Sequence, residues 1–433
     1  MTGARTGVAV AGLCWLFAAC AIPPPIEMND IAERYVKLVL RVGQHDADYV
    51  DAYSGAPAWT ATGARVPLPD LQREVQALRT DLSQIVVEAE PDERVRLRRQ
   101  YLEKQLAAVE TRIAMLSGET LSFDEEAQRL YDATPPATTE AELSRTLDEL
   151  DGLLPGSGAL VDRYAAFRDR YVIPADRLDR VFRAAIDGCQ ARTAAHIPLP
   201  PGETFTLEYV TGKSWSAYNW YKGNFTSVIQ VNTELPITID RAIDLACHEG
   251  YPGHHVYNAL LEQTLVRGRG WVEYSVYPLF SPQSLIAEGT ANFGIDVAFP
   301  GEARAAFERE TLYPLAGLDP DTAAAYTQVQ RGIDRLSYAG NEAARRYLNG
   351  EIDRAAAARW LQQWAMMPAD RALQRTKFFD QYRSYVINYN LGEDLVRAWV
   401  ESRGGTADRP DVRWREFTAL LSSPRLPSGL APR

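Results

Sequence analysis

The chain has 433 residues, of which 46% are hydrophobic, 24% charged and 10% aromatic, and its formal net charge is -11. This composition is that of a globular protein with enough apolar side chains for a large core. The acidic balance and the lack of a long basic run argue against nucleic acid as a partner.

The first 19 residues have the pattern of an export signal. Arg5 precedes an apolar run from Val8 to Ala19, which is too short to span a bilayer as a mature helix. We therefore predict a signal peptide over residues 1–19. Residues 20–27 follow as a tether, because they contain the triplet Pro23-Pro24-Pro25.

The end of the apolar run also predicts a lipid anchor. It reads Leu16-Phe17-Ala18-Ala19-Cys20, which resembles the cleavage box of a bacterial lipoprotein. We expect Cys20 to become the lipidated first residue, and cleavage by ordinary signal peptidase is the alternative. The protein is then an exported lipoprotein of the cell envelope that faces the periplasm and meets the membrane only through Cys20, or it is secreted.

The remaining chain predicts a mainly α fold. Apolar residues recur at helical spacing from residue 28 to residue 199, in segments over 31–42, 70–88, 92–116, 123–132, 139–154, 160–171 and 175–196. Three short β-branched and aromatic stretches, over 204–210, 215–221 and 227–233, predict one small antiparallel β-sheet. The helical pattern then returns to the end of the chain. We expect residues 28–199 and 200–433 to form one compact unit.

Two cysteines, Cys189 and Cys247, belong to the predicted folded part. They could pair in an oxidising envelope. Cys247 adjoins His248 but points about 100° away from it on a helix. We therefore favour a small buried core residue at this position.

Three of the five histidines lie in one segment, which reads His248-Glu249-Gly250-Tyr251-Pro252-Gly253-His254-His255. The zinc-protease pattern HExxH places its histidines four residues apart on one face of a helix. Here that position is Pro252, which cannot bind a metal. On an unbroken helix His254 would point about 120° away from His248, and His255 would lie about 10.5 Å further along the axis.

Proline and glycine in the same segment offer a way to bring the histidines together. Pro252 removes a helical hydrogen bond, and its ring clashes with the preceding turn. Gly250 and Gly253 permit unusual backbone angles beside it. A local bulge that absorbs two residues would restore the HExxH relation. We predict that His248 and His254 bind zinc, with His255 as the alternative to His254.

A later helix is expected to supply the third ligand. Glu288 lies in an otherwise apolar or small run, where an ionised carboxylate needs a partner. A metal can be that partner, and an arginine is the alternative. Asn292 and Asp296, one and two turns further on, are candidates for orienting the histidines.

These residues resemble a bacterial family catalogued as domain of unknown function 885, which is grouped with the gluzincin metallopeptidases. Residues 248–255 match its HExxPGHH motif, and Glu288-Gly289 match its later Glu-Gly. Residues 385–392 resemble its Ser-Tyr-x-x-Gly region, although Asn388 stands at the serine position. The family often has a further histidine, but no histidine follows His255 here. The resemblance implies a large helical, zincin-like metallopeptidase fold whose catalytic region is 200–433.

The function predicted from these patterns is zinc-dependent hydrolysis of peptide bonds in short peptides. Glu249 would be the general base, and Tyr389, with Tyr385 and Arg383 behind it, would donate to the developing oxyanion. The strand over 227–233 could offer its edge to a peptide, assisted by Asn232. A metal-binding lipoprotein without hydrolytic activity, and a zinc amidase or esterase acting on another substrate, are the alternatives.

Overall fold

Helices make up most of the chain, which confirms the mainly α fold class. The structure is a computed structural model that describes Gly3, residues 27–213 and residues 215–430. The predicted signal peptide, Cys20 and the tether up to residue 26 lie outside the described residues.

The first part of the chain folds into helices close to the predicted segments. Two of them begin with a capping box, in which Ser122 and Glu125, and likewise Thr139 and Glu142, exchange side-chain and backbone hydrogen bonds. The helices are α1 (Met28–Val42), α2 (Leu68–Ser83), α3 (Glu93–Leu116), α4 (Phe123–Tyr131), α5 (Glu140–Leu153), α6 (Leu160–Arg168) and α7 (Leu178–Ala194).

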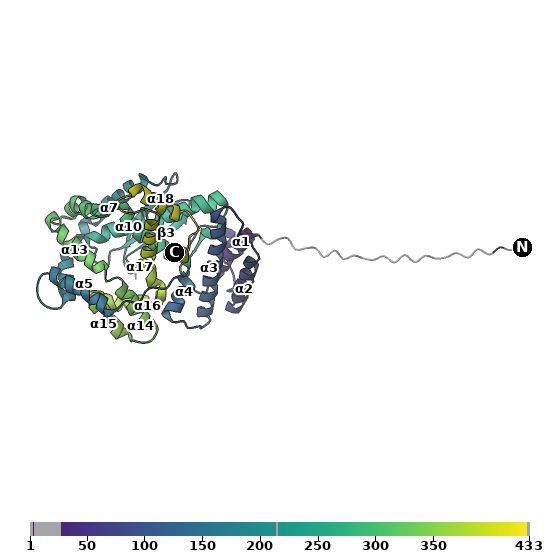
Figure 1. The fold of residues 1–433 in the computed structure, drawn as a ribbon, viewed down its shortest axis with the longest axis horizontal. Helices are drawn as coiled ribbons and strands as arrows, with labels where there is room; N and C mark the ends of the chain where they lie inside the picture. Colours follow the sequence, from purple (N-terminus) through teal and green to yellow (C-terminus); the bar gives the residue numbers. More distant parts are fainter. Residues whose placement is uncertain (1–2, 4–26, 214, 431–433) are drawn as a thin grey trace.

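The second part is also largely helical and surrounds one buried helix, α10 (Pro282–Ala298) (Figure 1). Almost every residue of α10 is buried, and most of its side chains are apolar or small, as in a core helix. The other helices are α8 (Ile239–Glu249), α9 (His254–Leu261), α11 (Ala303–Phe307), α12 (Tyr313–Ala316), α13 (Ala323–Asp334), α14 (Tyr338–Leu348), α15 (Arg354–Trp364), α16 (Ala369–Tyr382), α17 (Ile387–Ser402) and α18 (Pro410–Leu421).

A three-stranded sheet precedes the histidine segment, as predicted, but it is mixed rather than wholly antiparallel. Its strands are β2 (Thr204–Val210), β3 (Ala217–Gly223) and β4 (Thr226–Asn232), in the order β2-β4-β3. Strands β3 and β4 form an antiparallel hairpin, whereas β2 pairs with β4 in parallel. The antiparallel prediction is wrong for β2, because β4 lies between β2 and β3 and runs parallel to β2.

A second, two-stranded sheet was not predicted. Strand β1 (Val50–Tyr53) pairs antiparallel with β5 (Val276–Pro278), and the register shifts between Val50 and Ala52, at Asp51. Both strands are too short to show an alternating pattern, and their partners are far apart in sequence.

Helices α10 and α17 approach each other through a pair of glycines. A Cβ atom added to Gly289 would lie 2.3 Å from the backbone of Gly392, and one added to Gly392 would lie 2.7 Å from the carbonyl oxygen of Leu285. No larger side chain fits between these helices. The Glu-Gly of α10 and the Tyr-x-x-Gly of α17 therefore face each other at the centre of the molecule.

Several buried contacts join residues 28–199 to the rest of the chain. Arg98 on α3 forms an ion pair with the fully buried Glu273, with 2.6 Å between Nε and Oε1. Cys189 on α7 forms a disulfide with Cys247 on α8. Cys247 is therefore a disulfide partner and not the unpaired core residue that we favoured. The disulfide anchors the last turn of α8, next to His248.

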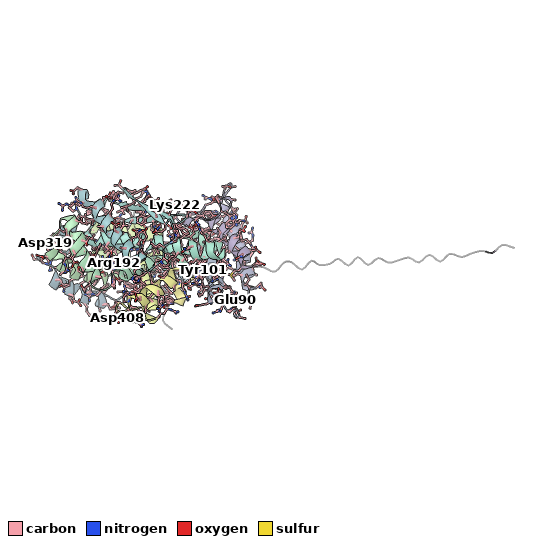
Figure 2. The ribbon with its side chains drawn as sticks, turned by 90° about the horizontal axis from the view of Figure 1, so that it is seen from above. Glu90, Tyr101, Arg192, Lys222, Asp319 and Asp408 are labelled. Carbon is pink, nitrogen blue, oxygen red and sulfur yellow. A yellow bond between two sulfur atoms is a disulfide. The ribbon has the colours of Figure 1, made fainter. Side chains whose placement is uncertain are left out.

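Exposed charged residues, among them Lys222, Asp319 and Asp408, lie at the periphery, whereas Tyr101 lies inside (Figure 2). Within the described residues, none of the helices has the length and apolarity needed to cross a bilayer.

Candidate metal centre

The histidine segment separates two helices, whereas we predicted a bulge within one continuous helix. Helix α8 ends at Glu249, and α9 begins at His254. The Tyr251–Pro252 peptide bond between them is cis. The backbone N–H of Gly253 donates to the carbonyl of Cys247 at 3.0 Å, and a Cβ atom on Gly253 would lie 1.8 Å from the carbonyl oxygen of His248. Only glycine allows this return of the chain, so Gly253 makes the turn that carries His254 back to His248.

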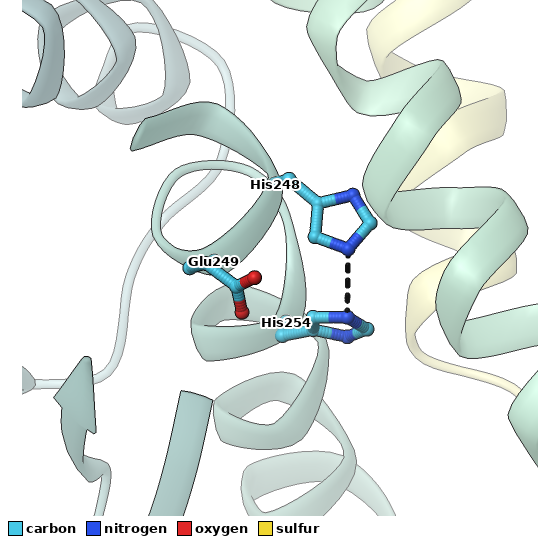
Figure 3. Close-up of side chains that lie close together, drawn as sticks. All are labelled: His248, Glu249 and His254. Carbon is cyan, nitrogen blue, oxygen red and sulfur yellow. Dashed lines mark hydrogen bonds between the residues drawn. The ribbon is translucent and has the colours of Figure 1, made fainter. Parts of the chain in front are cut away.

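The turn places two imidazole rings and one carboxylate around a single point. The Nε2 atoms of His248 and His254 lie 3.1 Å apart (Figure 3). Glu288 reaches in from α10, with Oε2 at 3.3 Å from Nε2 of His248 and Oε1 at 3.6 Å from Nε2 of His254. The structure thus brings together the three predicted ligands.

These spacings fit a tetrahedral metal ion. Bonds of roughly 2.0–2.1 Å to zinc place neighbouring ligand atoms roughly 3.3–3.4 Å apart. The 3.1 Å between the two imidazole nitrogens and the 3.3 Å from His248 to Oε2 of Glu288 lie near that value, whereas the 3.6 Å from His254 runs to the other carboxylate oxygen, Oε1. Glu288 is 6% exposed, and its Oε2 atom has no hydrogen-bond partner among the described residues. A buried carboxylate oxygen of this kind needs a cation or a donor.

Asn292 fixes the protonation of His248. Its Nδ2 donates to the carbonyl of Tyr389 at 2.8 Å, so its Oδ1 faces Nδ1 of His248, also at 2.8 Å. Nδ1 must therefore carry the hydrogen, which leaves the lone pair of Nε2 pointing into the centre. Asp296, the other predicted orienting residue, does not reach a histidine. Its partly exposed carboxylate instead forms an ion pair with Arg397 at 2.7 Å.

The electrostatic field at the centre favours positive charge. Burial alone would lower the pKa of His248, but its contact with Glu288 and the charges of Glu249 and Glu288 raise it to about 9. Burial would raise the pKa of Glu288, but the charges of His254 and His248 hold it well below its usual range. Protons and metal ions compete for this site for the same reason.

Glu249 stands beside the ligands and is free to act on a substrate. Its carboxylate is turned toward the space next to the two imidazole rings (Figure 3). The residue is 5% exposed, and no residue in the described ranges forms a hydrogen bond with its carboxylate. Burial raises the pKa of Glu249. A raised pKa suits a group that first takes a proton and then returns it.

His255 turns away from the centre. It is fully buried, its Nδ1 lies 2.9 Å from the Ser227 hydroxyl, and its Nε2 lies 2.8 Å from Oε2 of Glu203. Glu203 also accepts a hydrogen bond from Tyr251 at 2.8 Å. Both ring nitrogens of His255 are therefore engaged, and the geometry favours His254 as the ligand.

The predicted oxyanion donors have three different surroundings. The Tyr385 hydroxyl donates to Oε1 of Glu288 at 2.7 Å, so it positions a ligand. Arg383 donates to the buried Glu126 at 2.6 Å, so its guanidinium is already engaged. Tyr389 is half-buried, and its hydroxyl has no hydrogen-bond partner among the residues that the structure describes. Burial and the charge of Glu288 raise its pKa, so the hydroxyl stays protonated and can donate.

The predicted substrate contacts of β4 are wrong. This strand lies at the centre of the sheet, so neither of its edges is free, and the free edges belong to β2 and β3. Asn232 is buried, and its Nδ2 donates to the carbonyls of Lys213 and Trp215 at 3.0 and 3.1 Å. It closes the connection between β2 and β3 and is a structural residue.

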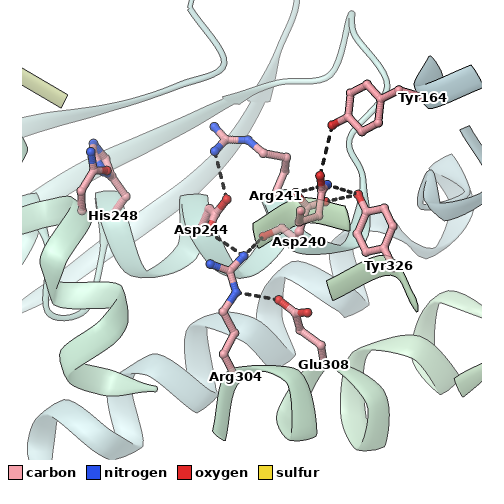
Figure 4. A network of polar contacts seen from close by, with 10 residues as sticks. Tyr164, Asp240, Arg241, Asp244, His248, Arg304, Glu308 and Tyr326 are labelled. Carbon is pink, nitrogen blue, oxygen red and sulfur yellow. Dashed lines mark hydrogen bonds and ion pairs between the residues drawn. The ribbon is translucent and has the colours of Figure 1, made fainter. Parts of the chain in front are cut away.

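A polar network fixes the beginning of α8, one and two turns before His248 (Figure 4). Asp244 forms an ion pair with Arg304 at 2.8 Å. Asp240 accepts a hydrogen bond from Tyr326 at 2.7 Å. Together with the disulfide, these contacts hold the helix that carries His248 in one position.

Sequence reasoning missed three residues near the centre. Asp51 on the short strand β1 feels the charges of Glu288 and Glu249, and its Oδ1 accepts a hydrogen bond from Tyr218. Asn219 on β3 donates from Nδ2 to the carbonyl of Glu249 at 2.7 Å. None of the three belongs to a motif, so no local signal in the sequence could have identified them.

Comparison with solved structures finds a fold similar to that of a protein from Colwellia psychrerythraea described as a putative lipoprotein. The TM-score is 0.53 and the sequence identity 14%, and the match covers 82% of this chain and 65% of that one. At this identity the likeness shows the fold alone. No family model matches the chain. No curated protein matches it either.

Proposed function

We propose that the protein is a zinc-dependent hydrolase that cleaves peptide bonds. The observation that carries this proposal is the convergence of His248, His254 and Glu288 at spacings of 3.1–3.6 Å, beside the unpaired carboxylate of Glu249. Two imidazoles and one carboxylate are a zinc donor set that leaves a fourth position open. Zinc, when bound, supplies an acidified water and polarises the scissile carbonyl.

The residues of the chain divide the remaining work. Asn292 keeps the Nε2 lone pair of His248 toward the centre, and Tyr385 holds Glu288. Glu249 takes a proton from the attacking water and delivers it to the leaving nitrogen. Tyr389 offers its hydroxyl to the oxygen that becomes negative. The free edges of β2 and β3 are the places where an extended peptide could add as a further strand.

Two variants test the proposal. Glu249→Gln should retain zinc and lose turnover of a peptide library, because it removes the base and leaves the ligands. His248→Ala should lose the metal, whereas the matched variant His196→Ala, at an exposed histidine stacked on Trp414, should keep it. Turnover at the wild-type rate by Glu249→Gln would refute the mechanism. Zinc without turnover of any peptide by the wild type would favour the non-hydrolytic protein or an amidase or esterase.

We also propose that the protein is an envelope lipoprotein anchored at Cys20. The cleavage box at the N-terminus supports this location, and the description of the Colwellia protein agrees with it. Cells fed labelled palmitate should label the wild type but not a Cys20→Ala variant. Equal labelling of both proteins would reject the anchor.

A further inference from the structure

A third acidic residue stands near the metal centre without a metal-binding role. Asp51 enters from β1, at the point where the register of the β1–β5 pairing shifts. Bulges of this kind re-aim a side chain out of the regular alternation of a strand. Tyr218 on the neighbouring strand β3 donates its hydroxyl to Oδ1 of Asp51 and so holds the carboxyl group in place.

No cation within the described residues forms an ion pair with Asp51. Burial above all, and then the charges of Glu288 and Glu249, raise its pKa to about 8. Such a carboxyl group gains most when a positive charge is placed against it, because an opposite charge favours its ionised form.

A second, independent observation concerns Asn219, the neighbour of Tyr218 on β3. Asn219 is 7% exposed, and its Nδ2 is fixed on the carbonyl of Glu249. Its Oδ1 atom is buried and has no hydrogen-bond partner among the described residues. The carboxylate of Glu249 likewise has no donor among the described residues, whereas Asp51 accepts from Tyr218 alone in that part of the chain. An ammonium group offers three N–H donors and no acceptor.

We propose that Asp51, positioned by Tyr218, binds a substrate ammonium group beside the metal centre. This inference rests on the proposed hydrolase and narrows its substrates to peptides with a free α-amino group or a basic side chain next to the scissile bond. The unpaired Oδ1 atom of Asn219, which follows Tyr218 on β3 and so faces the other side of the strand, would accept from a different group, such as a peptide N–H.

Binding of three probes to the zinc-loaded Glu249→Gln protein tests the proposal without turnover. The probes are tri-alanine, N-acetyl-tri-alanine and N-acetyl-Lys-Ala-Ala, and calorimetry gives each Kd. We expect at least one ammonium-bearing probe to bind on the order of 10- to 100-fold more tightly than N-acetyl-tri-alanine, as a charged hydrogen bond would provide. Tighter binding of tri-alanine identifies the α-ammonium, and tighter binding of the lysyl probe identifies the side chain.

The same titration is repeated with Asp51→Asn, Tyr218→Phe and Asp70→Asn added. Asp51→Asn should abolish the preference, Tyr218→Phe should reduce it a few-fold, and Asp70→Asn should keep it, because that residue lies exposed on α2. Equal binding of all probes, or a preference that survives both Asp51→Asn and Tyr218→Phe, overturns the inference. Wild-type turnover is measured separately, so an ammonium preference without cleavage rejects the hydrolase alone, and cleavage without a preference rejects the ammonium site alone.

Discussion

At the scale of single residues, the metal centre depends on a side chain that touches no metal. Asn292 is oriented by a backbone carbonyl and in turn fixes the hydrogen on Nδ1 of His248. We expect Asn292→Ala to weaken zinc binding about 10- to 100-fold, measured by competition with a chelating dye. Asp296→Ala is the control, because Asp296 pairs only with Arg397, and its affinity should match the wild type. Equal affinities for all three proteins would show that the Asn292 contact is dispensable.

Zinc binding should also depend on pH in a defined direction. In the metal-free protein the pKa of His248 is raised from 6.5 to about 9, so a proton occupies the ring at neutral pH and stabilises the fold. That contribution is fully present below pH 6.5 and is lost as the pH rises through about 9. Because zinc must displace the proton, its apparent affinity should rise about tenfold per pH unit up to about pH 9. Titrations between pH 6 and 9 that show no slope would contradict a protonated His248.

The approach of His254 to His248 could be predicted from the sequence because its signal is local. The spacing of His248 and His254, with proline and glycine between them, already contains the turn that joins them. The failures concern contacts made at a distance. Asp296 is on the right helix but meets Arg397, and Asp51 reaches the site from a strand some 200 residues earlier in the chain.

At the scale of elements, the contact between α10 and α17 decides where Glu288 lies relative to Tyr385 and Tyr389. Gly289→Ala would force a Cβ atom to 2.3 Å from the backbone of Gly392. We expect a loss of about 1–3 kcal/mol in the free energy of unfolding, measured with urea, together with weaker zinc binding. The matched change is Gly340→Ala on α14, where a Cβ atom meets nothing within 4 Å. It should stabilise the protein by up to about 1 kcal/mol, and equal losses in both variants would refute the packing argument.

Helices were predictable and strand pairing was not, for one physical reason. A helix records its apolar face and its caps within a few residues, as the capping boxes at Ser122 and Thr139 show. Pairing between strands depends on partners elsewhere in the chain. The position of β4 between β2 and β3 therefore could not be predicted from the sequence. The pairing of β1 with β5 could not be predicted either, because neither strand has a repeating pattern.

At the scale of the whole molecule, the Cys189–Cys247 disulfide closes a loop with a sequence separation of 58. Loop-closure entropy for that length corresponds to about 4 kcal/mol of stability. We expect the Cys189→Ala/Cys247→Ala double variant to unfold at lower denaturant by about that amount. A reducing agent should destabilise the wild type and leave the double variant unchanged. A wild type indifferent to reduction would show that the bond contributes little.

The pairing of β1 with β5 also sets the order in which the protein can mature. Strand β1 lies near the start of the sequence, and its partner β5 lies more than 200 residues later. Glu288 and Tyr385 lie later still. Such distant contacts form slowly. If the chain is exported N-terminus first, as we propose, its metal centre could not assemble in transit. Zinc would then bind to a nearly finished fold, and metal loading would be the last step of maturation rather than the start of folding.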